Sequence, residues 1–96
     1  MKKVIDSARQ QQLEDLFREA GEAHHQAYKE TDGADAEWPI WYAGYLRERL
    51  AKILNAGFTQ SELVYLLISL DHEVRRLAPG AKWQAYYART LLERYG

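Results

Sequence analysis

Three short breaks divide this 96-residue chain into four segments of helical length. The breaks are residues 31–33, 55–57 and 78–80, and each contains glycine. Glycine adopts the left-handed conformation that commonly ends a helix, and the proline of the last break cannot continue one. Because the connections are short, we expect neighbouring helices to pack antiparallel. The sequence therefore predicts an all-α fold, a single-domain four-helix bundle or a close variant over residues 1–96.

Capping and proline signals place the ends of these helices. Ser7 with Gln10 has the spacing of a capping box, in which two side chains satisfy free backbone N–H groups. Thr59 with Glu62 has the same spacing. Pro39 suits the first turn of a helix, where its missing N–H is not needed. We expect helices over residues 8–30, 39–55, 60–77 and 81–95.

Apolar residues recur at helical spacing in each segment, and the third segment, residues 60–77, is the most apolar. One face of this segment carries Leu63, Leu66, Leu67, Leu70, Val74 and Leu77. We therefore expect the third helix to be central and the most buried of the four.

The composition excludes several classes of function. Without cysteine, the chain cannot form disulfides, thiolate zinc sites, iron–sulfur clusters or a cysteine nucleophile. Its 13 basic and 14 acidic residues give a net charge of −1, which provides no general attraction to nucleic acid or to an anionic membrane. The chain has no glycine-rich phosphate loop. We expect no cofactor, no nucleic-acid partner and no membrane partner.

Two observations favour the cytoplasm as the compartment. Lys2 and Lys3 are soon followed by Asp6, so the apolar stretch that a signal peptide requires is missing. The longest apolar run, residues 63–68, is far shorter than the roughly 20 residues of a membrane span.

His24 shares the apolar arc of the first helix with three alanines. Small neighbours either let another helix approach closely or leave room for a ligand. A buried histidine is normally hydrogen-bonded within the protein, and the expected partner is a tyrosine or Asp71. The alternative is a site role for His24, as a ligand, an acid–base group or a pH-responsive element.

Asp71 is spaced i, i+4 from Arg75 on the border of an apolar face, and we expect these two side chains to pair. If the first and third helices pack together, Asp71 can also reach His24. A His24–Asp71 pair is then the candidate catalytic acid–base unit. A second alternative is a metal site of His24, His25 and Glu22. Glu-x-x-His is the spacing used by di-iron bundles, but these need the motif twice and it occurs once, so no metal is expected.

An acidic turn is followed by a run of large aromatic residues. Asp32 and Asp35 suit turn and cap positions without any bound ion. On the helical wheel Trp41 and Tyr45 lie opposite the leucine face, so these rings, with Trp38, need cover. The cover can come from the same chain, a second subunit, another protein or a ligand.

Three stretches carry a family resemblance: residues 23–45 (AHHQAYKETDGADAEWPIWYAGY), residues 61–67 (SELVYLL) and the stretch containing Trp83, Tyr86 and Tyr87. Together they resemble a group of short, uncharacterised bacterial helical proteins. No activity, cofactor or catalytic residue follows from this resemblance.

These patterns lead to the hypothesis of a small, non-enzymatic binding or regulatory module, or a protein-interaction module, that self-associates. Its binding surface would comprise His24, His25, Asp32, Asp35, Trp38, Trp41 and Tyr45. Residues 6–37 hold nine acidic and three basic side chains, whereas residues 38–96 hold five and eight, so opposite patches can also pair between copies. The alternative hypothesis is a small enzyme using His24 and Asp71, or a metal-binding protein.

Overall fold

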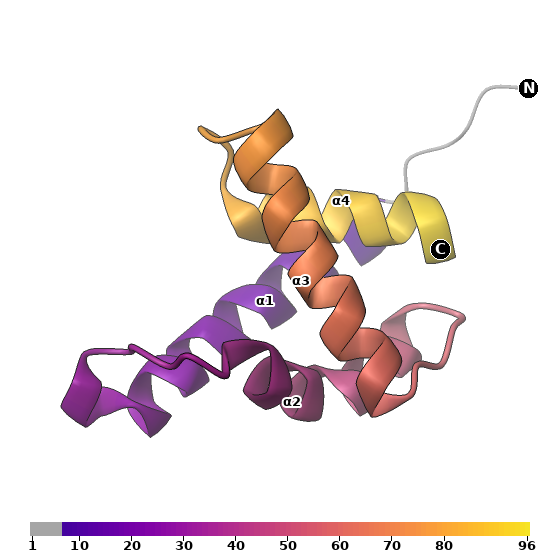
Figure 1. The fold of residues 1–96 in the computed structure, drawn as a ribbon. Helices are drawn as coiled ribbons and strands as arrows, with labels where there is room; N and C mark the ends of the chain where they lie inside the picture. The colour runs from indigo at the N-terminus through magenta and orange to yellow at the C-terminus, as the bar shows by residue number, and fades with distance from the viewer. Residues whose placement is uncertain (1–6) are drawn as a thin grey trace, which may run out of the picture.

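Four long helices and one short 3₁₀ turn make up the described part of the chain. The computed structural model describes residues 7–96. The elements are α1 (Ser7–Ala27), η1 (Lys29–Thr31), α2 (Trp38–Ile53), α3 (Gln60–Leu77) and α4 (Trp83–Tyr95), as Figure 1 shows. The predicted all-α, four-helix fold is confirmed. The signal-peptide prediction falls on residues 1–6, which lie outside the described residues.

Local signals set the helix ends much as the sequence predicts. The Thr59 hydroxyl accepts from the Glu62 N–H at 3.1 Å, and the Glu62 carboxylate accepts from the Thr59 N–H at 2.8 Å, so the predicted capping box is confirmed. Pro39 lies in the first turn of α2. The first helix ends three residues before its expected limit, because η1 replaces its last turn. Asp32 and Gly33 then reverse the chain with φ angles of 56° and 86°.

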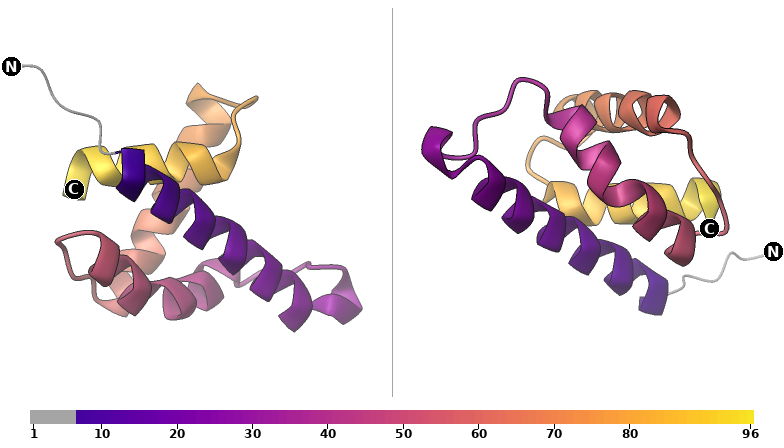
Figure 2. Two further views of the ribbon diagram at one scale, coloured as in Figure 1. Left: turned by 180° about the vertical axis from the view of Figure 1, so that it is seen from behind. Right: turned by 90° about the horizontal axis from the view of Figure 1, so that it is seen from below.

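The helices contact one another in a ring, α1 with α2, α2 with α3, α3 with α4, and α4 with α1. Figure 1 shows α3 crossing on the near side, and Figure 2, seen from behind, shows α1 on the opposite side. Helix α3 contacts both α2 and α4. Its apolar surface is wider than the contact with α2 and α4, which leaves Tyr65, Ile68 and Leu77 exposed.

The core forms between these layers from leucine-rich faces of all four helices. Phe17 is its largest completely buried side chain. The Phe17 ring makes edge-to-face contacts with the rings of Trp83 and Tyr87, at centroid distances of 5.9 and 5.6 Å. The buried apolar side chains are Leu13, Leu16, Phe17, Ala20, Ala43, Leu46, Leu50, Leu54, Leu63, Leu66, Leu67, Leu70, Val74, Tyr87, Ala88, Leu91 and Leu92.

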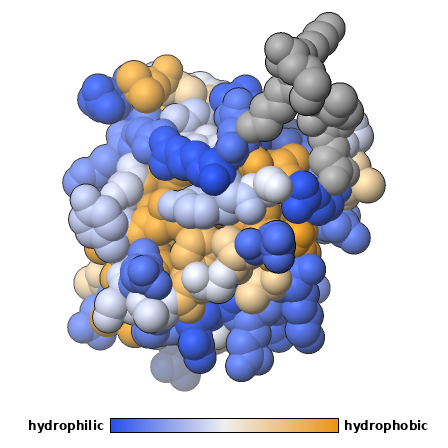
Figure 3. All heavy atoms as spheres, turned by 90° about the vertical axis from the view of Figure 1, so that its right-hand side faces the viewer, coloured by the Kyte–Doolittle hydropathy of each residue, from blue (hydrophilic) through white to orange (hydrophobic). Residues whose placement is uncertain are grey.

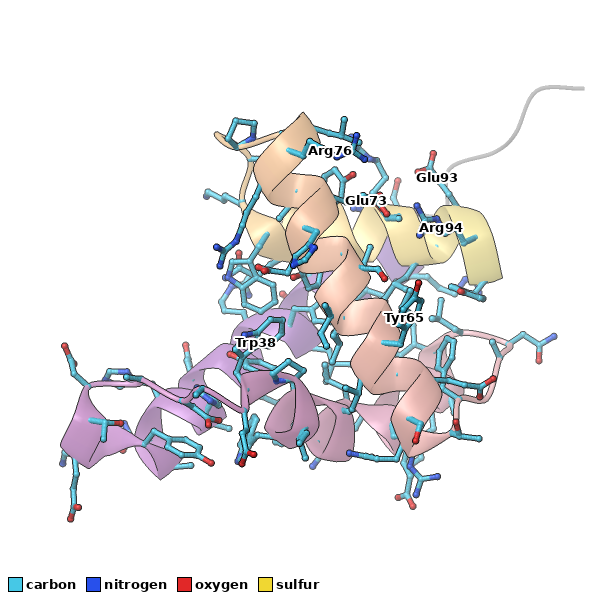
Figure 4. All side chains as sticks on the ribbon, viewed as in Figure 1. Trp38, Tyr65, Glu73, Arg76, Glu93 and Arg94 are labelled. Atoms are coloured by element: carbon cyan, nitrogen blue, oxygen red, sulfur yellow. The ribbon has the colours of Figure 1, made fainter. Side chains whose placement is uncertain are left out.

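Polar contacts tie α3 to α4 on the surface. Figure 4 shows Glu73 of α3 next to Arg94 of α4, and both carboxylate oxygens of Glu73 accept from this guanidinium at 3.0 and 3.1 Å. The Tyr86 hydroxyl also donates to Glu73. These contacts hold the pKa of Glu73 below its ordinary value, the Arg94 hydrogen bonds being the largest cause.

The end of the molecule that carries the C-terminus has an apolar band between hydrophilic margins (Figure 3). At this end Phe58 and Tyr95 form an edge-to-face contact with centroids 5.1 Å apart. Among residues 7–96, no helix combines the length and the apolar character needed to cross a membrane.

Candidate functional site

A buried histidine–aspartate pair joins the end of α1 to the loop before α2. His24 Nε2 lies 3.0 Å from Asp35 Oδ2, and each side chain is 7% exposed. A carboxylate only accepts hydrogen bonds, so the imidazole donates its Nε2 proton to Asp35. The prediction that His24 is a buried, internally hydrogen-bonded histidine is confirmed, but its partner is Asp35 rather than Asp71.

Aromatic rings surround the His24 imidazole on both faces and along one edge. Tyr28 stacks on it at a centroid distance of 4.8 Å and Tyr42 at 4.9 Å, with interplanar angles of 28° and 23°. Trp41 meets it edge to face at 5.0 Å. These contacts, together with the Asp35 hydrogen bond, hold the imidazole in one orientation.

The turn between α1 and α2 brings Asp35 back over His24. The Gly33 N–H donates to the Tyr28 carbonyl at 2.9 Å, and the Thr31 hydroxyl lies within hydrogen-bond distance of the carbonyls of Tyr28 and Ala34. These bonds fold residues 28–34 into a compact reversal. Asp35 Oδ1 accepts from the Glu37 N–H at 3.0 Å, which closes a turn just before α2. One carboxylate therefore serves both the turn and the imidazole.

The charge of this carboxylate is stabilised by its neighbours. The hydrogen bond from His24 is the largest cause that lowers the pKa of Asp35, the Glu37 N–H adds to it, and burial opposes both. The pKa of Tyr28 is shifted in the opposite direction, upward. Burial is the largest cause of this rise, and the charge of the nearby Asp35 carboxylate is the second.

The lowered pKa of Asp35 predicts that the protein loses stability at acid pH. A carboxyl whose pKa is lower in the folded state stabilises the fold fully above the unfolded pKa, near 3.8, and loses this contribution as the pH falls through the folded pKa. We expect the difference in unfolding free energy between the wild type and Asp35→Asn to be smaller at about pH 3 than at about pH 5. Urea denaturation at the two pH values measures it. Asp32→Asn, in the same turn but fully exposed, is the control, and an equal gap at both pH values would contradict the assignment.

His24 and Asp35 form one wall of a pocket of about 440 Å³ that all four helices help to line. This volume lies in the range typical of small-molecule sites. We call it the aromatic pocket, because most of its large side chains are rings. Its lining includes one imidazole, two carboxylates and one guanidinium, from His24, Asp35, Asp71 and Arg75, and the rings of Phe17, Trp38, Tyr42, Trp83 and Tyr87.

Asp71 and Arg75 of α3 form another wall of the aromatic pocket. Arg75 Nε donates to Asp71 Oδ1 at 3.2 Å, so the predicted pair is confirmed. The Asp71 side chain is 23% exposed, whereas that of Arg75 is 75% exposed.

Two tyrosines of the pocket have a raised pKa. Burial is the largest cause of the rise for Tyr87, and the negative charge of Asp71 raises the pKa of Tyr87 further. Burial and the charge of Asp35 do the same to the pKa of Tyr42.

His24 and Asp71 thus line one pocket without being hydrogen-bond partners. The metal alternative has no geometric support, because His25 is exposed and lies 4.0 Å from Asp32 on the surface. Glu22 is also exposed. Within residues 7–96, no three His, Asp or Glu side chains are gathered so that they could hold a metal ion.

The rings of Trp41 and Tyr45, which were predicted to need cover, are covered in part by other side chains of the same chain. Trp41 stacks on Tyr45 with an interplanar angle of 12°, and the guanidinium of Arg49 lies 4.0 Å from the centroid of the Tyr45 ring. The Tyr45 hydroxyl donates to Glu19 of α1, and this hydrogen bond is the first cause that raises the pKa of Tyr45. Trp38 turns instead toward the aromatic pocket (Figure 4).

Of the tyrosine and tryptophan residues that line the pocket, three were not among the predicted site residues: Tyr42, Trp83 and Tyr87. For Tyr42 the sequence did hold a signal, because it lies four residues after Trp38 and four before the buried Leu46, on one side of α2. Trp83 and Tyr87 read as ordinary core residues of α4. Their site role depends on the angle at which α4 meets the other helices, which no local pattern encodes.

Comparisons of this chain with protein-family models, with curated proteins and with solved structures find no match. The resemblance to short bacterial helical proteins stays a prediction.

Proposed function

We propose that this chain is a small helical binding module whose ligand site is the aromatic pocket. The observation that carries the proposal is the convergence of four polar side chains and five aromatic ones on one open pocket of about 440 Å³. Apolar walls with a few well-placed polar groups are characteristic of small-molecule sites. The cytoplasm is the compartment we propose for this activity.

Binding is favoured over acid–base catalysis by the hydrogen bonds of the site. His24 donates to Asp35, and Asp71 accepts from Arg75, so the two members of the candidate catalytic pair bond to other residues and not to each other. The stacking of His24 between Tyr28 and Tyr42 also fixes the ring as a structural support for the pocket wall.

Self-association stays a second proposal, through the surface that Trp38, Trp41 and Tyr45 were predicted to form. The stacking of Trp41 on Tyr45 covers part of both rings, while each remains partly exposed. Sedimentation at micromolar concentration tests it, and a monomer would exclude it.

A cavity-filling substitution tests the binding site. Val74 is buried and lines the aromatic pocket, so Val74→Phe is expected to fill it and to weaken ligand binding at least tenfold. The measurement is an NMR screen of small aromatic fragments against the labelled chain, in which the indole N–H signals of Trp38 and Trp83 report binding.

The matched control is Val64→Phe, at a half-buried position of the same helix that does not line the pocket. It is expected to keep the binding of the wild type. The proposal fails if no fragment shifts the pocket signals, or if Val74→Phe, shown to be folded by circular dichroism, binds fragments as the wild type does.

A further inference from the structure

The charges that line the aromatic pocket are unequally exposed to water. Asp35 and Asp71 are 7% and 23% exposed, whereas the one guanidinium of the lining, Arg75, is 75% exposed. Water screens an exposed charge more than a buried one. The two carboxylates are therefore screened less than the guanidinium of Arg75. The raised pKa values of Tyr42 and Tyr87, each partly caused by one of these carboxylates, are consistent with a negative interior.

One carboxylate oxygen on the pocket wall remains available. Asp71 accepts from Arg75 through Oδ1, and within residues 7–96 Oδ2 of Asp71 has no hydrogen-bond partner. Among the described residues, every buried side-chain nitrogen or oxygen has a hydrogen-bond partner. Because Oδ2 of Asp71 has none, this oxygen is accessible to solvent. Because Asp71 lines the pocket, its carboxylate is the acceptor on this wall that a donor entering the pocket would meet.

The aromatic lining adds a second preference for positive charge. Trp38, Tyr42, Trp83 and Tyr87 belong to one connected set of ring contacts, with Tyr42 6.0 Å from Trp38 and 6.1 Å from Trp83, centroid to centroid. Tyrosine and tryptophan rings attract cations through their negative faces. An anion would meet the same faces and the two carboxylates unfavourably, and the Nε2 proton of His24 is already donated to Asp35.

From these contacts we infer that the aromatic pocket binds a small organic cation, an arylalkylammonium or alkylammonium compound, with its charge beside Asp71 and its apolar part among the rings. This inference rests on the proposed binding function and names the class of its ligand.

Three probes of similar size and different charge test the inference. They are 2-phenylethylammonium, 2-phenylethanol and 3-phenylpropanoate, each titrated into the labelled chain and followed by NMR. We expect the cation to bind at least about tenfold more tightly than the neutral alcohol, and the anion to bind most weakly. If the alcohol or the anion binds at the pocket as tightly as the cation, the inference is wrong while the binding function stands. If none of the three shifts the pocket signals, both fail.

Two charge variants locate the effect. Asp71→Asn is expected to lower the affinity for the cation far more than the affinity for 2-phenylethanol, and so to remove most of the preference for the cation. Arg75→Gln is expected to act in the opposite direction, because it removes the compensating positive charge. Asp15→Asn, on the surface of α1 away from the pocket, is the matched control and is expected to bind as the wild type does. An unchanged cation preference in folded Asp71→Asn would overturn the assignment.

Discussion

Phe17→Ala is expected to lower the free energy of unfolding by about 3–5 kcal/mol, the largest loss of stability for any single ring in this fold. Phe17 is completely buried on α1, and its ring meets the rings of Trp83 and Tyr87 on α4. Its removal leaves a cavity at the α1–α4 contact and also enlarges the aromatic pocket, which Phe17 lines.

Urea denaturation followed by circular dichroism measures this loss. Leu77→Ala is the control, because Leu77 is 60% exposed and its truncation is expected to change stability by less than about 0.5 kcal/mol. Equal stability of the two variants would contradict the packing of α1 on α4.

His24→Ala is expected to be the most damaging polar substitution. It removes a buried ring that is stacked between Tyr28 and Tyr42, and it removes one of the hydrogen-bond donors of the Asp35 carboxylate. Loss of the stacked ring alone is expected to cost about 2–4 kcal/mol of unfolding free energy. The pocket wall formed by the turn is expected to loosen at the same time, so fragment binding weakens.

Two comparisons separate these causes. His25→Ala, at the adjacent exposed position, is expected to change the melting temperature little. His24→Gln keeps a hydrogen-bond donor but not the stacked ring, and we expect a stability between those of the wild type and His24→Ala. The account is contradicted if His24→Ala and His25→Ala melt at the same temperature.

Most of the fold could be predicted from local signals. The Thr59–Glu62 capping box and Pro39 mark helix starts that depend only on neighbouring residues, and both lie where the sequence placed them. The early end of α1 could not be predicted, because Gly33 permits more than one way to close the turn. The exposure of Leu77 could not be predicted either. Helical spacing identifies the apolar face of a helix, but it does not indicate how far the partner helices extend along that face.

The candidate site was predictable only in part. His24 was identifiable, because it is a polar residue on an apolar arc, and the Asp71–Arg75 pair was identifiable from its spacing on one helix. The partner of His24 was not, because Asp35 reaches it through the left-handed geometry of Asp32 and Gly33. Helical wheels describe contacts within and between helices, and they carry no information about a turn that folds back over one.

The most direct test of a cation-binding aromatic pocket is a crystal structure of the chain grown with 2-phenylethylammonium. We predict that the ammonium group lies within hydrogen-bond distance of Asp71, that the phenyl ring lies among Trp38, Tyr42 and Trp83, and that His24 keeps its bond to Asp35. A crystal in which side chains fill the pocket, or in which the cation binds only elsewhere on the surface, would contradict this account.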